Sequence, residues 1–146
     1  MRSKNYAKFE FPAKSCNEAF ARACVSSFAA QLDPTIDELG DIKTSVSEAV
    51  TNAVVHAYPN TLGVIYLKLR ILGEDTIEIT VKDRGKGIEN VKKAMEPLFT
   101  TGGDDRSGMG FTIMDSFMDK MKVTSSPGKG TNVVMCRRIR AKNELK

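Results

Sequence analysis

The chain has 146 residues, with 41% hydrophobic residues, 27% charged residues and a formal net charge of +4. This length and composition predict a single globular domain over residues 1–146. No apolar run is long enough to cross a bilayer, and the first residues lack the charged and then apolar pattern of a secretion leader. We therefore expect a cytoplasmic protein rather than a membrane-bound or secreted one.

Cysteine and charge patterns exclude two further classes. Cys16, Cys24 and Cys136 are widely spaced and form no C-x-x-C pair that could hold a metal, so we interpret them as reduced thiols. The C-terminal part is basic, but it lacks the interleaved aromatic residues and the recognition helix of a nucleic-acid-binding segment. We interpret it as a solvated strand end. Its basic residues are Arg137, Arg138, Arg140, Lys142 and Lys146.

Two helices are predicted in the first part of the chain. Residues 15–31 begin with Ser15-x-x-Glu18, which has the form of a capping box. The apolar face of this helix has four-residue spacing and comprises Phe20, Cys24 and Phe28. After Asp33-Pro34, which ends the first helix, a second helix begins at the capping box Thr35-x-x-Glu38 and ends at Tyr58-Pro59-Asn60. Its apolar stripe comprises Leu39, Ile42, Val46, Ala49 or Val50, and Ala53.

Beyond this break the apolar period changes to two, which is typical of strands. Apolar and polar residues alternate over 67–71 and 77–81, and Gly73-Glu74-Asp75 forms the turn of a predicted β-hairpin. Residues 84–110 are rich in glycine and charge, with a short helix near 91–95. An irregular stretch of this length inside a compact domain is usually functional.

The last part of the chain predicts one more helix and two strands. The helix spans Gly110–Met121, and its methionines are assigned to the core. Strands over 122–126 and 131–139 flank the turn Pro127-Gly128-Lys129-Gly130. The predicted fold class is α+β, a two-layer α/β sandwich with helices on one face of a mixed, largely antiparallel sheet.

Glu48 and Asn52 form the first of four short motifs that suggest a nucleotide site. They are one helical turn apart, so their side chains emerge on the same face and can act on one ligand. An amide oxygen suits Mg²⁺, which usually takes only one or two protein ligands. A carboxylate can accept a proton from an attacking hydroxyl. His56, the only histidine, follows one turn later, a position more typical of a structural or solvated side chain.

The second motif, Asp83-x-Gly85-x-Gly87, directly follows a predicted strand. A carboxylate at a strand end can accept a hydrogen bond from the exocyclic amine of adenine, whereas guanine presents an acceptor at that position. The cost of an unpaired buried group, about 1–3 kcal/mol, is enough to select the base. Taken alone, the motif is also typical of an ordinary turn with glycines at positive φ.

The third and fourth motifs are glycine turns. Gly108-x-Gly110 precedes a helix, whose free N–H groups and positive dipole end favour phosphate. Taken alone, Gly128-x-Gly130-Thr131 is typical of a hairpin turn. Thr131, however, begins the last strand and could hydrogen-bond to Asp83 or to a water beside the adenine base. This spacing fits neither the P-loop nor the dinucleotide-binding fingerprint.

In this order, the four motifs resemble the N, G1, G2 and G3 boxes of the GHKL (Bergerat-type) ATPase superfamily, which includes gyrase, histidine kinases and MutL. Within it, nearly the whole chain resembles the anti-sigma F factors of endospore-forming bacteria. The stretches that carry this closer resemblance are Leu32-Asp33-Pro34-Thr35, residues 47–53, Pro97-Leu98-Phe99-Thr100-Thr101 and residues 106–114.

The resemblance implies a homodimeric serine-protein kinase that inhibits a sporulation sigma factor and uses ATP and Mg²⁺ to phosphorylate a serine of an anti-anti-sigma antagonist. It implies that Glu48 is the catalytic base, Asn52 the Mg²⁺ ligand and Asp83 the adenine reader. Arg106 would face the terminal phosphate, and Arg22 in the first helix would lie at the partner surface. The other residues implied to line the nucleotide are Gly85, Gly87, Thr100, Thr101, Ser107, Gly108, Met109, Gly110 and Thr131.

Three alternatives stay open at the level of sequence. A general-stress-type anti-sigma kinase would share the same boxes. A histidine-kinase catalytic domain would need a helical hairpin that carries the phosphorylated histidine, and the sequence shows no such hairpin. A nucleotide-gated binding module without turnover would use the same pocket as a kinase.

Overall fold

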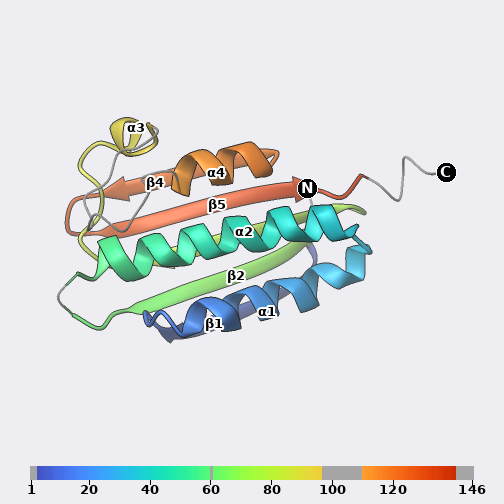
Figure 1. The fold of residues 1–146 in the computed structure, drawn as a ribbon, viewed down its shortest axis with the longest axis horizontal. Helices are drawn as coiled ribbons and strands as arrows, with labels where there is room; N and C mark the ends of the chain where they lie inside the picture. The colour runs from blue at the N-terminus through green and yellow to red at the C-terminus, as the bar shows by residue number, and fades with distance from the viewer. Residues whose placement is uncertain (1–2, 60, 97–109, 141–146) are drawn as a thin grey trace.

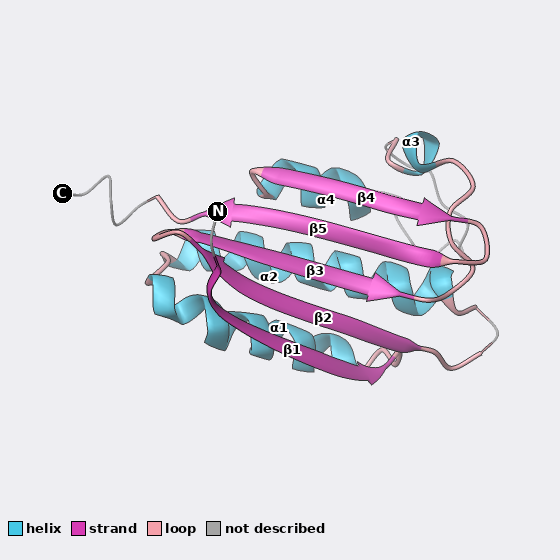
Figure 2. Cartoon of the chain, turned by 180° about the vertical axis from the view of Figure 1, so that it is seen from behind, coloured by secondary structure: helices cyan, strands magenta, loops and turns pink. Residues whose placement is uncertain are grey.

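The molecule is built as one sheet covered by helices on one face (Figures 1 and 2). A computed structural model describes residues 3–59, 61–96 and 110–140. The elements, in chain order, are β1 (Ser3–Pro12), α1 (Asn17–Ala29), η1 (Ala30–Leu32), α2 (Ile36–Asn52), η2 (Ala53–Ala57), β2 (Val64–Leu72), β3 (Thr76–Asp83), α3 (Val91–Ala94), α4 (Gly110–Phe117), β4 (Lys120–Ser126) and β5 (Gly130–Arg138).

The five strands lie in the order β1-β2-β3-β5-β4, and each of the four neighbouring pairs is antiparallel. Helices α1, α2 and α4 cover the same face of this sheet, whereas Figure 2 shows the strands uncovered on the other face. The predicted α+β sandwich is therefore confirmed, with antiparallel pairing throughout these five strands. No helix within the described ranges combines the length and the apolar character that a membrane crossing requires.

The predicted hairpin forms β2 and β3, and alternate side chains of these strands point into the core. The inward residues of β3, for example, are Ile77, Ile79 and Val81, each no more than 3% exposed. Burial of such side chains stabilises the fold by about 1.5–3 kcal/mol each relative to exposure. The sheet is therefore a rigid layer, and the helices that carry site residues pack against it.

Helix α2 follows its sequence signals closely. Thr35 Oγ1 accepts a hydrogen bond from Glu38 N (3.1 Å), and the Glu38 carboxylate accepts one from Thr35 N (3.0 Å), which completes the predicted capping box. The Glu38 side chain is buried and also accepts from Arg140 N (2.8 Å). Of the predicted apolar stripe, Leu39 is partly buried and the other members are fully buried: Ile42, Val46, Ala49, Val50 and Ala53.

Helix α1 differs from its prediction in its cap and in its buried face. Cys16 is the N-cap residue and makes no side-chain cap bond, and Glu18 instead accepts a hydrogen bond from the Thr51 hydroxyl. The fully buried residues of α1 are Ala21, Val25 and Ala29. Phe20, in contrast, is 48% exposed, and its ring packs edge-on against rings of β1. Small side chains at the helix contact let α1 approach its neighbours closely, which places the larger rings at the rim.

Two further differences concern strands. Strand β1 is absent from the predicted elements, although its inward Phe9 and Phe11 alternate with exposed Lys8, Glu10 and Pro12. The predicted helix over Gly110–Met121 is too long: α4 ends at Phe117, and Met121 lies in β4 opposite Met135 of β5. A methionine two residues from Val123 satisfies the strand period as well as the helical one, and pairing with β5 decides between them.

Candidate nucleotide site

Asp83 occupies the last inward position of β3. It continues the buried series of that strand and is only 6% exposed. Its Oδ1 accepts hydrogen bonds from Gly85 N (2.9 Å) and from Thr131 N (3.2 Å). Burial raises the pKa of the Asp83 carboxyl, and the two N–H donors act in the opposite direction. The predicted adenine reader is therefore a desolvated carboxylate in a fixed orientation.

The two glycines after Asp83 allow close backbone contacts within the protein. A Cβ on Gly85 would lie 2.2 Å from the carbonyl oxygen of Ala57, the last residue of η2. Gly87 has φ +76°, and a Cβ there would lie 2.0 Å from Ser126 O. Lys86 N between them donates to Ala57 O (3.0 Å). Only glycine fits either position, so the loop is pressed between the end of η2 and the end of β4.

Tyr58 connects two segments in this region, although its place in the sequence indicates only the end of a helix. Its hydroxyl accepts a hydrogen bond from Arg84 N (2.7 Å) and donates one to Val64 O (2.9 Å). It therefore joins the loop after β3 to the start of β2. These contacts are non-local, and the local sequence carries no pattern from which they could be found.

The fourth predicted motif lies beside the second. Thr131 is the register partner of Asp83 across β3 and β5. Gly130 has φ +86°, and a Cβ on it would lie 2.2 Å from Asp83 O. Gly128 N donates to Lys86 O (2.7 Å), which links the turn between β4 and β5 to the loop after β3. The two motifs thus form one hydrogen-bonded unit at this end of the sheet.

Glu48 and Asn52 meet the start of α4. A Cβ built on Gly110 would lie 3.2 Å from Glu48 Oε2, 3.2 Å from Asn52 Nδ2 and 3.3 Å from Asn52 Oδ1. Both side chains are half-buried. The structure therefore brings the acid and the amide of α2 together with the glycine at which α4 begins. An amide oxygen beside a helix N-terminus suits a cation bound to a phosphate.

The next face of α2 contacts α1. Arg22 Nη1 donates to Ser47 Oγ (2.9 Å), and the Thr51 hydroxyl donates to the carboxylate of Glu18. Ser47 and Thr51 each precede one of the two site residues of α2 by a single position. Arg22, which the resemblance implies at the partner surface, is thus half-buried and bonded within the chain.

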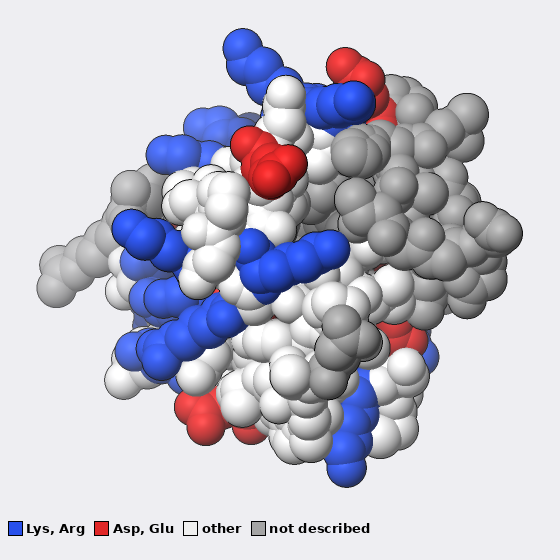
Figure 3. All heavy atoms as spheres, turned by 90° about the vertical axis from the view of Figure 1, so that its left-hand side faces the viewer, with Lys and Arg blue, Asp and Glu red and all other residues white. Residues whose placement is uncertain are grey.

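The end of the molecule at which β3 ends and β5 begins is rich in positive charge. Figure 3 shows Lys and Arg side chains gathered on this side. Lys86 and Lys129 lie in the two loops that meet there. A positive field of this kind favours approach of a polyphosphate.

Several predicted residues lie outside the described ranges. For nucleotide binding these are Thr100, Thr101, Arg106, Ser107, Gly108 and Met109, and for the basic C-terminal part they are Lys142 and Lys146. In the described part of the chain no three His, Cys, Asp or Glu side chains are grouped so that they could hold a metal ion. The assignment of Mg²⁺ to Asn52 therefore stays a prediction. All three cysteines are free thiols, and burial raises the pKa of Cys24 and Cys136.

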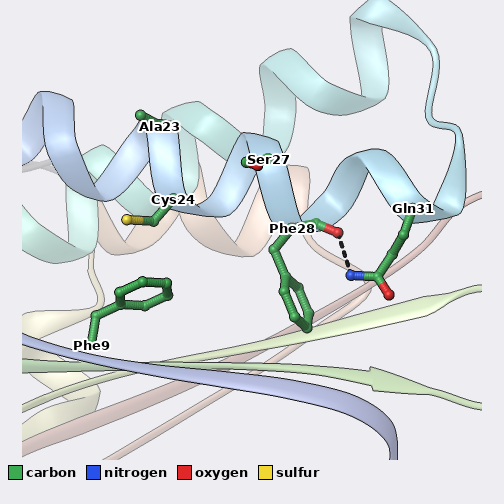
Figure 4. A pocket seen from close by; sticks show the side chains of 6 residues that line it. All are labelled: Phe9, Ala23, Cys24, Ser27, Phe28 and Gln31. Carbon is green, nitrogen blue, oxygen red and sulfur yellow. Dashed lines mark hydrogen bonds between the residues drawn. The ribbon is translucent and has the colours of Figure 1, made fainter.

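A separate shallow hollow lies between α1 and β1, and none of the predicted nucleotide residues lines it. Figure 4 shows Phe9 and Phe28 facing it beside the thiol of Cys24, and Gln31 Nε2 donating to Phe28 O (2.7 Å) at one end. Its lining is mostly apolar, with no charged side chain among its residues. The lining residues therefore offer no cationic partner to a triphosphate.

Comparison with known proteins identifies the family of the chain. The family model described as a histidine kinase-like ATPase domain matches residues 11–137. The anti-sigma F factor of Caldanaerobacter subterraneus subsp. tengcongensis is 56% identical over 140 residues, which cover 95% of this chain and 97% of the relative. The anti-sigma F factor of Clostridium acetobutylicum is 53% identical over 133 residues, covering 90% and 92%.

Solved structures support the fold. The RsbU and RsbW domains of a Mycobacterium tuberculosis protein superpose with a TM-score of 0.68 at 19% identity, covering 93% of this chain and 32% of that one. The histidine kinase domain of a blue-light activated kinase from Erythrobacter litoralis superposes with a TM-score of 0.60 at 22% identity, covering 88% and 63%. Because its relatives are more than half identical to it over almost its whole length, the chain belongs to the anti-sigma F factor family, within the histidine kinase-like ATPase domains.

Proposed function

We propose that this protein binds and inhibits a sporulation sigma factor and uses ATP to phosphorylate a serine of the sigma factor's anti-anti-sigma antagonist. The observation that carries the kinase part is the meeting of Glu48 and Asn52 with Gly110. The anti-sigma part is supported by the name of relatives that match almost the whole chain.

ATP would be selected at Asp83. One carboxylate oxygen is occupied by the N–H groups of Gly85 and Thr131, which orients the carboxylate. The remaining acceptor capacity suits the exocyclic amine of adenine and opposes the carbonyl of guanine. The phosphates would extend toward the first turn of α4, whose N–H groups favour negative charge.

Asn52 would hold Mg²⁺ through its amide oxygen. When bound, the ion neutralises phosphate charge, together with water and phosphate oxygens as its other ligands. Asn52 itself fixes the side of α2 on which the terminal phosphate must lie.

Glu48 would act as the general base. The serine hydroxyl of the antagonist attacks the γ-phosphorus, a new O–P bond forms, and the bond to the β–γ bridging oxygen breaks to release ADP. Glu48 accepts the proton that the hydroxyl loses. Its position one turn from Asn52 keeps the base beside the phosphate that reacts.

The partner surface would include the outer side of α1. Arg22 offers five N–H donors, and its bond to Ser47 uses one of them. Ultracentrifugation would test the proposed homodimer, which has twice the 16.0 kDa mass of the chain.

The deciding experiment mixes the protein with radiolabelled ATP and an anti-anti-sigma protein of the same bacterium. Acid-stable label on a serine of the antagonist supports the proposal. Acid-labile label would indicate a phosphohistidine enzyme, and sigma-factor binding in ATP without any labelled antagonist would indicate a binding module without turnover. Either result would overturn the assignment as a serine kinase.

A further inference from the structure

A row of three inward-facing residues crosses the sheet at the predicted base site. Thr131 of β5 is the register partner of Asp83 in β3 on one side and of Ser125 in β4 on the other. Ser125 has no role in any of the four motifs. It is nevertheless as close to Thr131 in the sheet as the predicted adenine reader is.

The hydroxyl of Ser125 joins the loop after β3 to the start of β5. Its Oγ accepts a hydrogen bond from Ile88 N (2.8 Å). The same atom lies 2.8 Å from Gly130 O and 2.8 Å from Thr131 Oγ1. One side chain thus contacts the residue directly after the second motif and two residues of the fourth.

Counting protons assigns the direction of each bond. A serine hydroxyl has one proton, and a carbonyl oxygen can only accept, so Ser125 donates to Gly130 O. The bond between the two hydroxyls must then be donated by Thr131. With its only proton directed at Ser125, Thr131 Oγ1 presents acceptor lone pairs alone, beside the acceptor-only carboxylate of Asp83.

We propose that Ser125 is a positioning residue that sets base specificity by holding the Thr131 hydroxyl as an acceptor. This inference rests on the proposed ATP-binding function and deepens it. Two adjacent acceptors suit the amine of adenine or a water that it contacts, and they repel the carbonyl of guanine. Without Ser125 the Thr131 hydroxyl can rotate and donate to that carbonyl, so the selectivity of the site falls.

The test measures binding of ATP and of GTP by calorimetry for the wild type, Ser125→Ala and Ser126→Ala. Ser126 is the exposed neighbour of Ser125, so its variant makes the same chemical change one position away. We expect Ser125→Ala to bind ATP about tenfold more weakly and to lose about tenfold of its preference for ATP over GTP. Ser126→Ala should match the wild type. Phosphate transfer at saturating ATP should be unchanged in both, because Ser125 does not reach the reacting groups.

Rescue separates this role from a structural one. Ser125→Thr retains a hydroxyl and should restore the ATP preference, and Ser125→Cys, with its weak donor, serves if the alanine variant proves unstable. The inference is overturned if Ser125→Ala, or Ser125→Cys in its place, keeps the wild-type ratio of ATP to GTP affinity. A wild-type protein that binds neither nucleotide would instead overturn the proposed function.

Discussion

Asp83 and its neighbours are held by hydrogen bonds between strands and loops, whereas Glu48 and Asn52 are held by the packing of two helices. At the base-reading end, Gly85 and Gly130 are fixed within the protein by contacts that admit no side chain. At the predicted phosphate end, a Cβ on Gly110 would lie 3.2–3.3 Å from side-chain atoms of Glu48 and Asn52, slightly closer than an ordinary contact. In the proposed site, base recognition would thus depend on a rigid frame, and catalysis would depend on a helix contact that can adjust by tenths of an ångström.

The largest effect is expected from Glu48→Gln at the helix-built end. The amide cannot accept the proton of the attacking serine, so the transfer rate should fall by about 10²–10⁴-fold. ATP binding should stay close to that of the wild type, because the residues around the predicted adenine site are unchanged. Single-turnover transfer and calorimetry measure the two quantities. Undiminished transfer would remove Glu48 from the mechanism.

Asp83→Asn tests the strand-built end. The amide oxygen can still accept from Gly85 N and Thr131 N, so the loop should keep its geometry. The amide N–H₂ group would then face the amine of adenine, donor against donor, and ATP affinity should fall about tenfold to a hundredfold. Calorimetry measures this loss. Unchanged affinity would show that the adenine amine is read elsewhere.

The same variant should alter the pH dependence of stability. Because burial raises the pKa of the Asp83 carboxyl above its ordinary value, the folded state holds this proton more tightly than the unfolded state. Its stabilising contribution is complete below the unfolded pKa and is lost as pH rises through the folded pKa. Asp83→Asn should lack this decline, so the free energy of unfolding of the variant should rise relative to that of the wild type over that pH interval. Urea unfolding at a series of pH values measures it, and parallel curves would contradict it.

Gly110→Ala should disturb the helix contact more mildly. The added Cβ lies 3.2 Å from Glu48 Oε2, so that carboxylate must shift by a few tenths of an ångström. We expect transfer at saturating ATP to slow about tenfold, because small misplacements of a catalytic group are costly. A variant with wild-type transfer would show that the contact does not set the position of the base.

The smallest effect is expected from Gly40→Ala, which is the matched control. Gly40 lies in α2, and a Cβ on it meets no atom within 4 Å. Alanine should raise the free energy of unfolding by about 0.5–1 kcal/mol through helix propensity alone. Urea unfolding measures this gain, and transfer and ATP binding should not change. A loss of transfer would mean that changes anywhere in α2 reach the site, which would weaken the interpretation of Gly110→Ala.

The parts of the fold that sequence could predict are those with local signals. Helix α2 has a capping box and an apolar stripe within one segment, and the hairpin of β2 and β3 has strict alternation and a turn. Strand β1 carries only a weak alternation, since most of its residues are exposed at a sheet edge. The extent of α4 depended on strand pairing, which sequence spacing does not report.

The candidate site shows the same division. The four motifs are local, and the structure places Asp83 beside Thr131 and Glu48 beside Gly110. Tyr58 and Ser125 act through partners that only the register of distant strands and loops brings near. The spacing of residues along the chain does not indicate such contacts, so neither Tyr58 nor Ser125 was predicted.

Helix α2 contacts α1, α4 and the sheet, so the positions of these three neighbours are linked through one helix. Ser47 and Thr51 of α2 bond to α1 on one face of the helix, and Glu48 contacts the start of α4 on an adjacent face. A third face of α2 is buried against the sheet. Because these contacts share one helix, a rotation of α2 that broke its bonds to α1 would also move Glu48 relative to the first turn of α4. The bonds between α1 and α2 therefore also help to set the direction of the Glu48 carboxylate, the proposed general base.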